Sequence, residues 1–154
     1  MPLPSSFTEA TVVFRRIASN IFSRLLELGA QFIEREIVPI TEGARQFQAR
    51  VTANVMRIVA REIQLGEPQL REEISALAAV LGRPEPTPQS AKEAQAAALA
   101  LSEELSARIR AGEADEGPWR QRAFDVARKL VEDKLKVDNP RYLEADIAAR
   151  ARAR

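Results

Sequence analysis

The chain has 154 residues, of which 45% are hydrophobic and 5% aromatic, a composition that suits one helical domain with a core of ordinary size. Its 23 basic and 22 acidic residues leave a formal net charge of +1, which excludes a strong field of one sign for gathering nucleic acid or anionic lipid. The absence of cysteine and histidine excludes disulfides, thiol nucleophiles, serine–histidine pairs and the common zinc and di-iron sites. We therefore expect no metal, no cofactor and no familiar catalytic residue.

The first predicted helix runs from about Thr8 to Leu28. Its apolar residues recur mostly at three- and four-residue spacing, at Val12, Val13, Ile17, Ile21, Leu25 and Leu28. Gly29 either breaks or bends this helix, and the pattern then resumes until Pro39 ends the segment near Ile40.

A second helix is predicted from Ala44 to Leu65. We expect its apolar stripe to face the core, through Phe47, Val51, Val55, Ile58, Ile63 and Leu65. Gly66 is a candidate C-terminal cap, and Pro68 suits the first turn of a separate short helix that Gly82 closes.

Three alternating prolines predict an extended loop over residues 83–89, followed by a helix with Ser90 and Glu93 as a capping box. After Gly112, Pro118 opens a last long helix that stops near Asn139 and Pro140. The tail, residues 144–154, alternates alanine and arginine, so we expect it to fray or to form a marginal helix.

These elements predict an all-α fold, an antiparallel bundle of five or six helices. We divide the chain into a helical N-terminal extension (residues 1–22), a bundle domain (residues 23–143) and the tail. The N-terminus lacks the pattern of a signal peptide, and no apolar run approaches the roughly 20 residues that a membrane span needs. We therefore expect a cytoplasmic protein that binds neither membrane nor nucleic acid.

One ridge of the second helix carries three arginines and an amide at spacings of four, three and four residues, Arg50, Asn54, Arg57 and Arg61, followed by Glu62. Such a ridge can hold a phosphate, a carboxylate or an acidic protein surface. The alternative is a solvated helix face, with Asn54 fixing the register of a neighbouring helix.

The segment after the last long helix also concentrates side chains that suit recognition. Asn139 precedes proline and is pushed out of the helical region, while Arg141 and Tyr142 are residue types enriched in interface hot spots. The alternative is a C-terminal cap that folds back on the core.

Four stretches together resemble a little-characterised bacterial family of small helical proteins: Phe47, residues 50–62 (RVTANVMRIVARE), residues 105–112 (LSARIRAG) and residues 134–143 (KLKVDNPRYL). The resemblance covers about residues 23–143. Members of this family are encoded beside aminoglycoside-phosphotransferase-like kinases, often near acyl-CoA dehydrogenases, and resemble the small accessory subunit of hydroxyacyl-CoA kinases. No catalytic residue is known in this family.

The resemblance implies a non-catalytic accessory or regulatory subunit of a phosphotransferase-like kinase in acyl-CoA or hydroxyacid catabolism. The alternative is a stand-alone helical bundle that binds an acyl-CoA or another anionic metabolite, with Arg50, Arg57 and Arg61 receiving its phosphates. An enzyme that acts alone ranks below both. Amphipathic helices fit monomers and assemblies equally, so homo-oligomers stay open.

Overall fold

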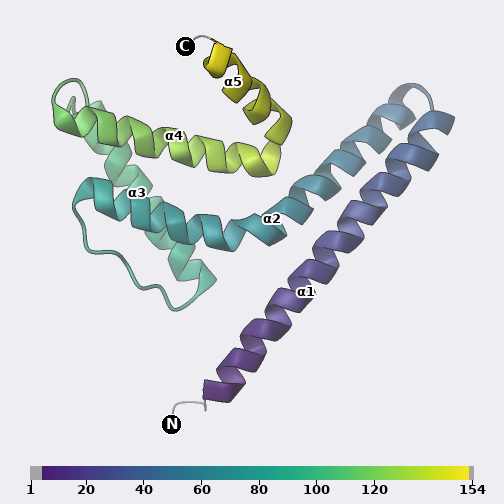
Figure 1. Cartoon of the computed structure of the whole chain (residues 1–154), viewed down its shortest axis with the longest axis horizontal. Helices are drawn as coiled ribbons and strands as arrows, with labels where there is room; N and C mark the ends of the chain where they lie inside the picture. The colour runs from purple at the N-terminus through teal and green to yellow at the C-terminus, as the bar shows by residue number, and fades with distance from the viewer. Residues whose placement is uncertain (1–4, 153–154) are drawn as a thin grey trace. The chain divides into compact units, whose positions relative to one another are not determined.

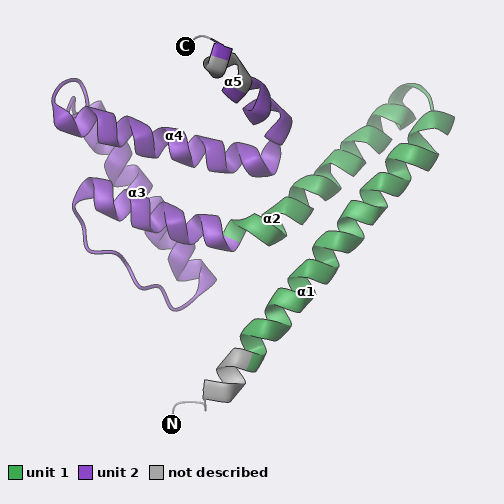
Figure 2. Cartoon of the chain, viewed as in Figure 1, with its two compact units in different colours: residues 1–66 green, residues 67–154 purple. Residues whose placement is uncertain are grey.

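A computed structural model of the chain describes residues 5–152, and every regular element within them is helical (Figure 1). In chain order these elements are α1 (Ser5–Phe32), the π-helix η1 (Ile33–Ile37), the 3-10 helix η2 (Val38–Ile40), α2 (Gly43–Leu81), α3 (Ala91–Arg110), α4 (Pro118–Asp138) and α5 (Pro140–Arg152). The predicted all-α fold is confirmed. The chain divides into two compact units, Met1–Gly66 and Glu67–Arg154 (Figure 2).

Unit 2 has an apolar core built by α2, α3 and α4. Leu77 is completely buried, and the surrounding cluster includes Ile74, Ala78, Val80, Leu81, Ala94, Ala98, Leu101, Leu105 and Ala123. Alanine on α3 lets the helices approach closely, while leucine and isoleucine fill the space between them.

The loops of unit 2 follow from local backbone chemistry. Gly82, at a φ of 67°, ends α2 in a Schellman motif, in which the Arg83 N–H donates to the Ala78 carbonyl at 2.9 Å. Ser90 caps α3 as predicted, since its hydroxyl accepts from the Glu93 N–H at 3.2 Å. The Glu93 carboxylate accepts from the Gln89 N–H at 2.8 Å, one residue before the usual capping-box position.

Unit 1 is an antiparallel pair formed by α1 and the first half of α2. Its packed faces carry small or polar residues: Ser23, Ala30, Ala53 and Ala60 are all at most 1% exposed. A Cβ at Gly29 would overlap the terminal methyl of Met56, so glycine permits a close approach of the two helices there. Gly29 leaves α1 unbroken, and the pair turns at Pro39, where the predicted segment ends.

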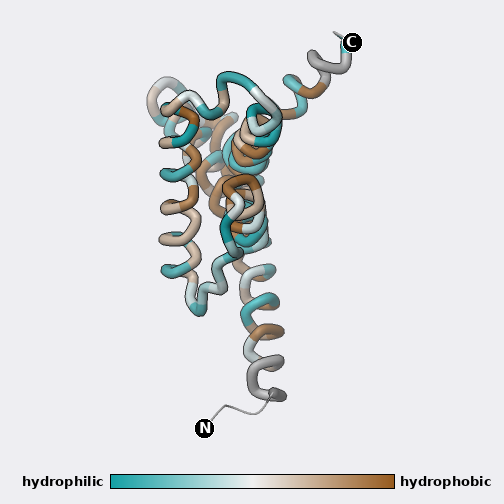
Figure 3. The backbone as a smooth tube through the Cα atoms, turned by 90° about the vertical axis from the view of Figure 1, so that its left-hand side faces the viewer, coloured by the Kyte–Doolittle hydropathy of each residue, from teal (hydrophilic) through white to brown (hydrophobic). Residues whose placement is uncertain are grey.

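The predicted core stripe of the second helix is wrong for Phe47, Val51 and Val55, which are exposed, whereas Ile58, Ile63 and Leu65 are half-buried. The periodic apolar residues of α1 also face outward, since Val12, Val13, Ile17, Ile21, Leu25 and Leu28 are all more than half exposed. The periodicity identifies an apolar face, but the small residues on the other face pack better at short interhelical distance. The alternation of apolar and polar residues along the chain can be followed in Figure 3.

The predicted break between two helices at Gly66 and Pro68 is also wrong. Residues 43–81 form one helix, and Gly66 keeps a negative φ instead of capping an end. Proline can hold the helical φ, so Pro68 removes one backbone hydrogen bond without forcing a turn. Its ring is exposed, and the following residues Leu70 and Ile74 pack in or against the core of unit 2.

The C-terminal segment is more regular than the predicted tail. The last long helix ends at Asp138 as expected, but Pro140 then opens α5, which continues to Arg152. Of the predicted tail, residues 153–154 lie outside the described part of the chain, as do residues 1–4 of the predicted extension. Among the described helices, none combines the length and apolar character needed to cross a membrane.

Candidate functional site

The predicted arginine ridge lies on the first half of α2. Arg50 and Asn54 are exposed on this ridge, Glu62 is exposed beside it, and Arg61 is half-buried. Asn54 was expected, in the alternative interpretation, to fix the register of a neighbouring helix. Its side chain is exposed, so its amide can be hydrogen-bonded by water and requires no partner on that helix. The ridge is therefore a polar, mainly cationic edge of unit 1 and not a buried network.

Arg57 differs from the other ridge residues because α1 and η1 supply carboxylates to it. Its guanidinium binds both oxygens of Glu34, with Nη2 to Oε2 at 2.6 Å, and its Nε lies 3.9 Å from Glu27 Oε2. The hydrogen bond that Arg57 donates to Glu34 raises the pKa of Arg57. This bidentate pair connects η1 to α2, so the guanidinium of Arg57 is already bound to a carboxylate.

An apolar stripe runs along α2 beside the ridge, made of Phe47, Val51, Val55 and Val59, each four residues after the last. We call it the α2 stripe. Its members are 42% to 69% exposed. An apolar centre bordered by arginine has the composition of a protein interface, whose rim is polar and in which arginine is enriched. Sequence reasoning found Phe47, Val51 and Val55 but placed them in the core, and it did not single out Val59.

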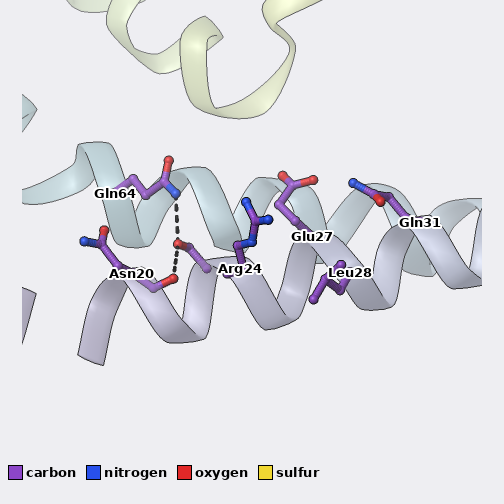
Figure 4. A pocket seen from close by; sticks show the side chains of 7 residues that line it. Asn20, Arg24, Glu27, Leu28, Gln31 and Gln64 are labelled. Atoms are coloured by element: carbon purple, nitrogen blue, oxygen red, sulfur yellow. Dashed lines mark hydrogen bonds between the residues drawn. The ribbon is translucent and has the colours of Figure 1, made fainter. Parts of the chain in front are cut away.

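A groove of about 410 Å³ lies between α1 and α2 within unit 1 (Figure 4). Across it, Gln64 Nε2 donates to Ser23 Oγ at 2.8 Å, and the Ser23 hydroxyl donates to the Asn20 carbonyl at 3.1 Å. The groove is lined by Asn20, Ser23, Arg24, Glu27, Leu28, Gln31 and Gln64. With Leu28 as its one apolar residue, this lining suits a small polar group more than an acyl chain.

The second predicted recognition segment lies in unit 2. Asn139 ends α4 and caps α5, because its side-chain oxygen accepts from the Tyr142 N–H at 3.2 Å. Leu143 is buried, while Arg141 is exposed and Tyr142 is 60% exposed. Asn139 and Leu143 thus fix the turn between α4 and α5, while the side chains of Arg141 and Tyr142 are exposed to solvent.

Sequence reasoning missed a buried ion cluster around Asp133, which is 7% exposed. Lys129 and Lys136 donate to its two oxygens at 2.7 and 2.6 Å, and Lys129 also reaches Glu72 on α2 at 2.9 Å. Burial acts to raise the pKa of Asp133, but the hydrogen bonds from the two lysines outweigh it and lower that pKa. A carboxylate held ionised in this way is a structural tie and a poor general base.

The spacing of Lys129 and Asp133 along a helix was the available signal for this cluster, but such pairs are ordinary on solvated helices. Its burial depends on how α2 packs against α4, which one sequence does not reveal. Within the described residues, no group of three or more acidic side chains is arranged to hold a metal ion.

Comparison with protein families gives one match. The model of the domain of unknown function DUF6285 matches residues 39–142, which include the α2 stripe, the ridge and the segment from Asn139 to Tyr142. Helix α1 precedes the matched region. No curated protein and no solved structure matches the chain. Because the match spans about two thirds of its residues, the chain belongs to the DUF6285 family.

Proposed function

We propose that this chain is a non-catalytic accessory subunit that binds a phosphotransferase-like kinase through the α2 stripe and the arginines beside it. The observation that supports this proposal is the exposure of Phe47, Val51, Val55 and Val59 on a single helix face. Each such side chain gains about 1.5–3 kcal/mol on full burial, so half-exposed side chains in a row favour a protein partner.

The chemistry of the chain supports a binding role over an enzymatic one. Histidine and cysteine, which serve most often as general base and nucleophile, are absent from the sequence. The most buried carboxylate, Asp133, is neutralised by two lysines, and Arg57 is paired with Glu34. An accessory subunit needs a surface that orders its partner and contributes no reacting group.

The identity of the partner rests on the family resemblance of the sequence, which implies an aminoglycoside-phosphotransferase-like kinase acting on acyl-CoA or hydroxyacid metabolites. The α2 stripe lies inside the region matched by the DUF6285 model. A contact surface in this region would be available to other chains of the family, as a common partner requires.

The first test is reconstitution with a phosphotransferase-like kinase of the class that the family resemblance implies. The two purified proteins should form a complex in sedimentation velocity, and Val55→Asp should weaken it by about tenfold or more, since the new charge is buried. Ala79→Asp is the matched control, because it adds the same charge at an exposed position of the same helix, 20 residues beyond the end of the stripe. No complex with the wild-type chain would reject the function, and equal binding by both variants would reject the surface.

Two further substitutions test the predicted recognition residues. Arg61→Ala and Tyr142→Ala should each weaken the complex, because arginine and tyrosine are common hot spots, while the isolated variants keep the wild-type circular dichroism. Normal binding by both variants would remove these two residues from the contact surface.

The alternative is a stand-alone bundle that binds an acyl-CoA or another anionic metabolite. The groove of unit 1 offers Arg24 and polar groups to an anion, but little apolar lining to an acyl chain. Arg57, one of the three arginines expected to bind phosphate, is paired with Glu34. Calorimetric titration of the purified chain with several acyl-CoAs decides the matter. Saturable heat supports a ligand-binding bundle, and its absence excludes that role.

A further inference from the structure

A second apolar stripe lies on α1, before the family-matched region begins. It consists of Phe14, Ile17, Ile21, Leu25, Leu28 and Phe32, which are 52% to 71% exposed. We call it the α1 stripe. At 3.6 residues per turn these positions share one face, opposite the face on which Ser23 and Ala30 pack against α2. The α1 stripe is therefore left uncovered by the packing of unit 1.

The size of the α1 stripe matches what a stable interface requires. It spans 19 residues, or about 27 Å of helix. Six large side chains that each expose on the order of 100 Å² amount to roughly 600 Å², compared with about 800 Å² per partner in a standard protein interface. A patch of this size lies at the upper limit for the surface of a monomer.

Four of the six residues in the stripe lie symmetrically about position 23, and Ile17 and Leu28 lie six residues before and five residues after it. Phe14 and Phe32 lie nine residues before and after this position, and Ile21 and Leu25 lie two residues before and after it. A two-fold interface places each residue of one copy against its counterpart in the other, so it needs such self-complementarity. In two antiparallel copies of α1, Phe14 of one copy would contact Phe32 of the other. Ile21 and Leu25 of both copies would lie at the centre.

Charge distribution distinguishes the antiparallel arrangement from the parallel one. Arg15 and Arg16 lie near one end of the stripe, and Glu34, Arg35 and Glu36 lie just past the other end, where Glu34 already binds Arg57 and Glu36 is exposed. Parallel pairing would gather four arginines at one end, whereas antiparallel pairing brings arginine and glutamate to the same end. No charged residue lies among the six positions of the stripe itself.

From this surface we infer that the chain forms a homodimer in which the α1 stripes of two copies pair antiparallel around position 23. The occupant of the stripe is thus a second copy of this chain. This inference is independent of the proposed function, because the α2 stripe points away from α1 and stays available to another protein. The dimer would present two such surfaces.

Sedimentation equilibrium of the full chain tests the dimer. The chain has a mass of 17.1 kDa, and the wild-type protein should sediment at twice this mass at micromolar concentration. Ile21→Asp should weaken the dimer on the order of 100-fold, because each interface then buries two unpaired carboxylates. Asn20→Asp is the matched control, one residue away on an exposed position off the stripe, and should leave the dimer unchanged.

A wild-type chain that stays at 17.1 kDa at 100-fold higher concentration overturns the dimer, and an Ile21→Asp variant that dimerises normally overturns the assigned surface. Orientation has its own test, because the chain lacks cysteine. When Phe14→Cys and Phe32→Cys variants are mixed and oxidised, antiparallel pairing predicts disulfides between the two different variants. Disulfides within each variant would overturn the antiparallel arrangement.

Discussion

The two units of this chain use opposite faces of their helices for packing. In unit 2 large apolar residues of α2 and α3 such as Ile74 and Leu101 lie in the core around the fully buried Leu77. Others on α3 and α4, among them Leu99 and Phe124, are exposed. In unit 1 small residues such as Ala30 and Ala53 fill the contact, and the large apolar residues point outward. Helix α2 contributes to both units, so the change occurs along a single helix.

This difference indicates what each unit needs in order to be stable. Unit 2 gains the free energy of burying a conventional apolar core within its own chain. Unit 1 gains close contact and the ion pair of Arg57 with Glu34, but its apolar surface loses contact with water only when another protein covers it. Stability should therefore reside in unit 2 and association in unit 1.

The largest effect is expected from Leu77→Ala, in the core of unit 2. Removing a fully buried leucine side chain should lower the free energy of unfolding by about 2–5 kcal/mol, since both its burial and its packing are lost. Urea denaturation measures this change. The matched control is Leu99→Ala on α3, where the leucine is 61% exposed and the expected change is within about 0.5 kcal/mol. Equal losses would contradict the division between inward and outward residues.

A smaller effect is expected from Ala53→Leu, at the contact of unit 1. Ala53 is completely buried between two closely packed helices, so a larger side chain should cost about 1–3 kcal/mol through overpacking. Hydrogen exchange of α1 amides should become faster while amides of α3 stay protected. Thr52→Leu, exposed on the neighbouring position, serves as the control, and a protected α1 in Ala53→Leu would show that the contact is loose.

Much of the fold follows from local chemistry that the sequence displays. The Ser90 cap, the glycines at 82 and 112 and the prolines at 39 and 118 each determine backbone geometry within a few residues. Pro68 misleads because its effect depends on context: the same residue can start a helix or remain inside one. Packing on either side of Pro68, and not local preference, keeps α2 continuous.

The candidate site was harder to predict because it depends on which face of a helix is covered. Periodicity identifies Val51 and Val55 as members of an apolar face, yet an apolar face serves a core and an interface equally well. The ridge was correctly placed on one side of α2, but the pairing of Arg57 with Glu34 joins residues 23 positions apart. Contacts of this range follow from tertiary packing, which spacing along one helix does not encode.

The smallest effect concerns Asp133, which tests whether a buried polar cluster contributes to the stability of unit 2 alongside its apolar core. Asp133→Asn should lower the free energy of unfolding by about 1–2 kcal/mol at pH 7, because hydrogen bonds to charged groups are lost beside lysines that stay partly solvated. Since the pKa of Asp133 is lowered in the folded chain, its contribution is complete above the unfolded value of about 3.9.

That contribution must disappear as the pH falls through the folded pKa, where the wild-type carboxyl is protonated and resembles the amide. Urea denaturation of both proteins between pH 7 and pH 2 should therefore show two curves that converge in acid. Asp138→Asn, the same substitution at an exposed carboxylate of the same helix, is the matched control and should differ little from wild type at any pH in this range. A constant difference between wild type and Asp133→Asn across this range would mean that the side chain stabilises α4 by packing alone, and not by its charge.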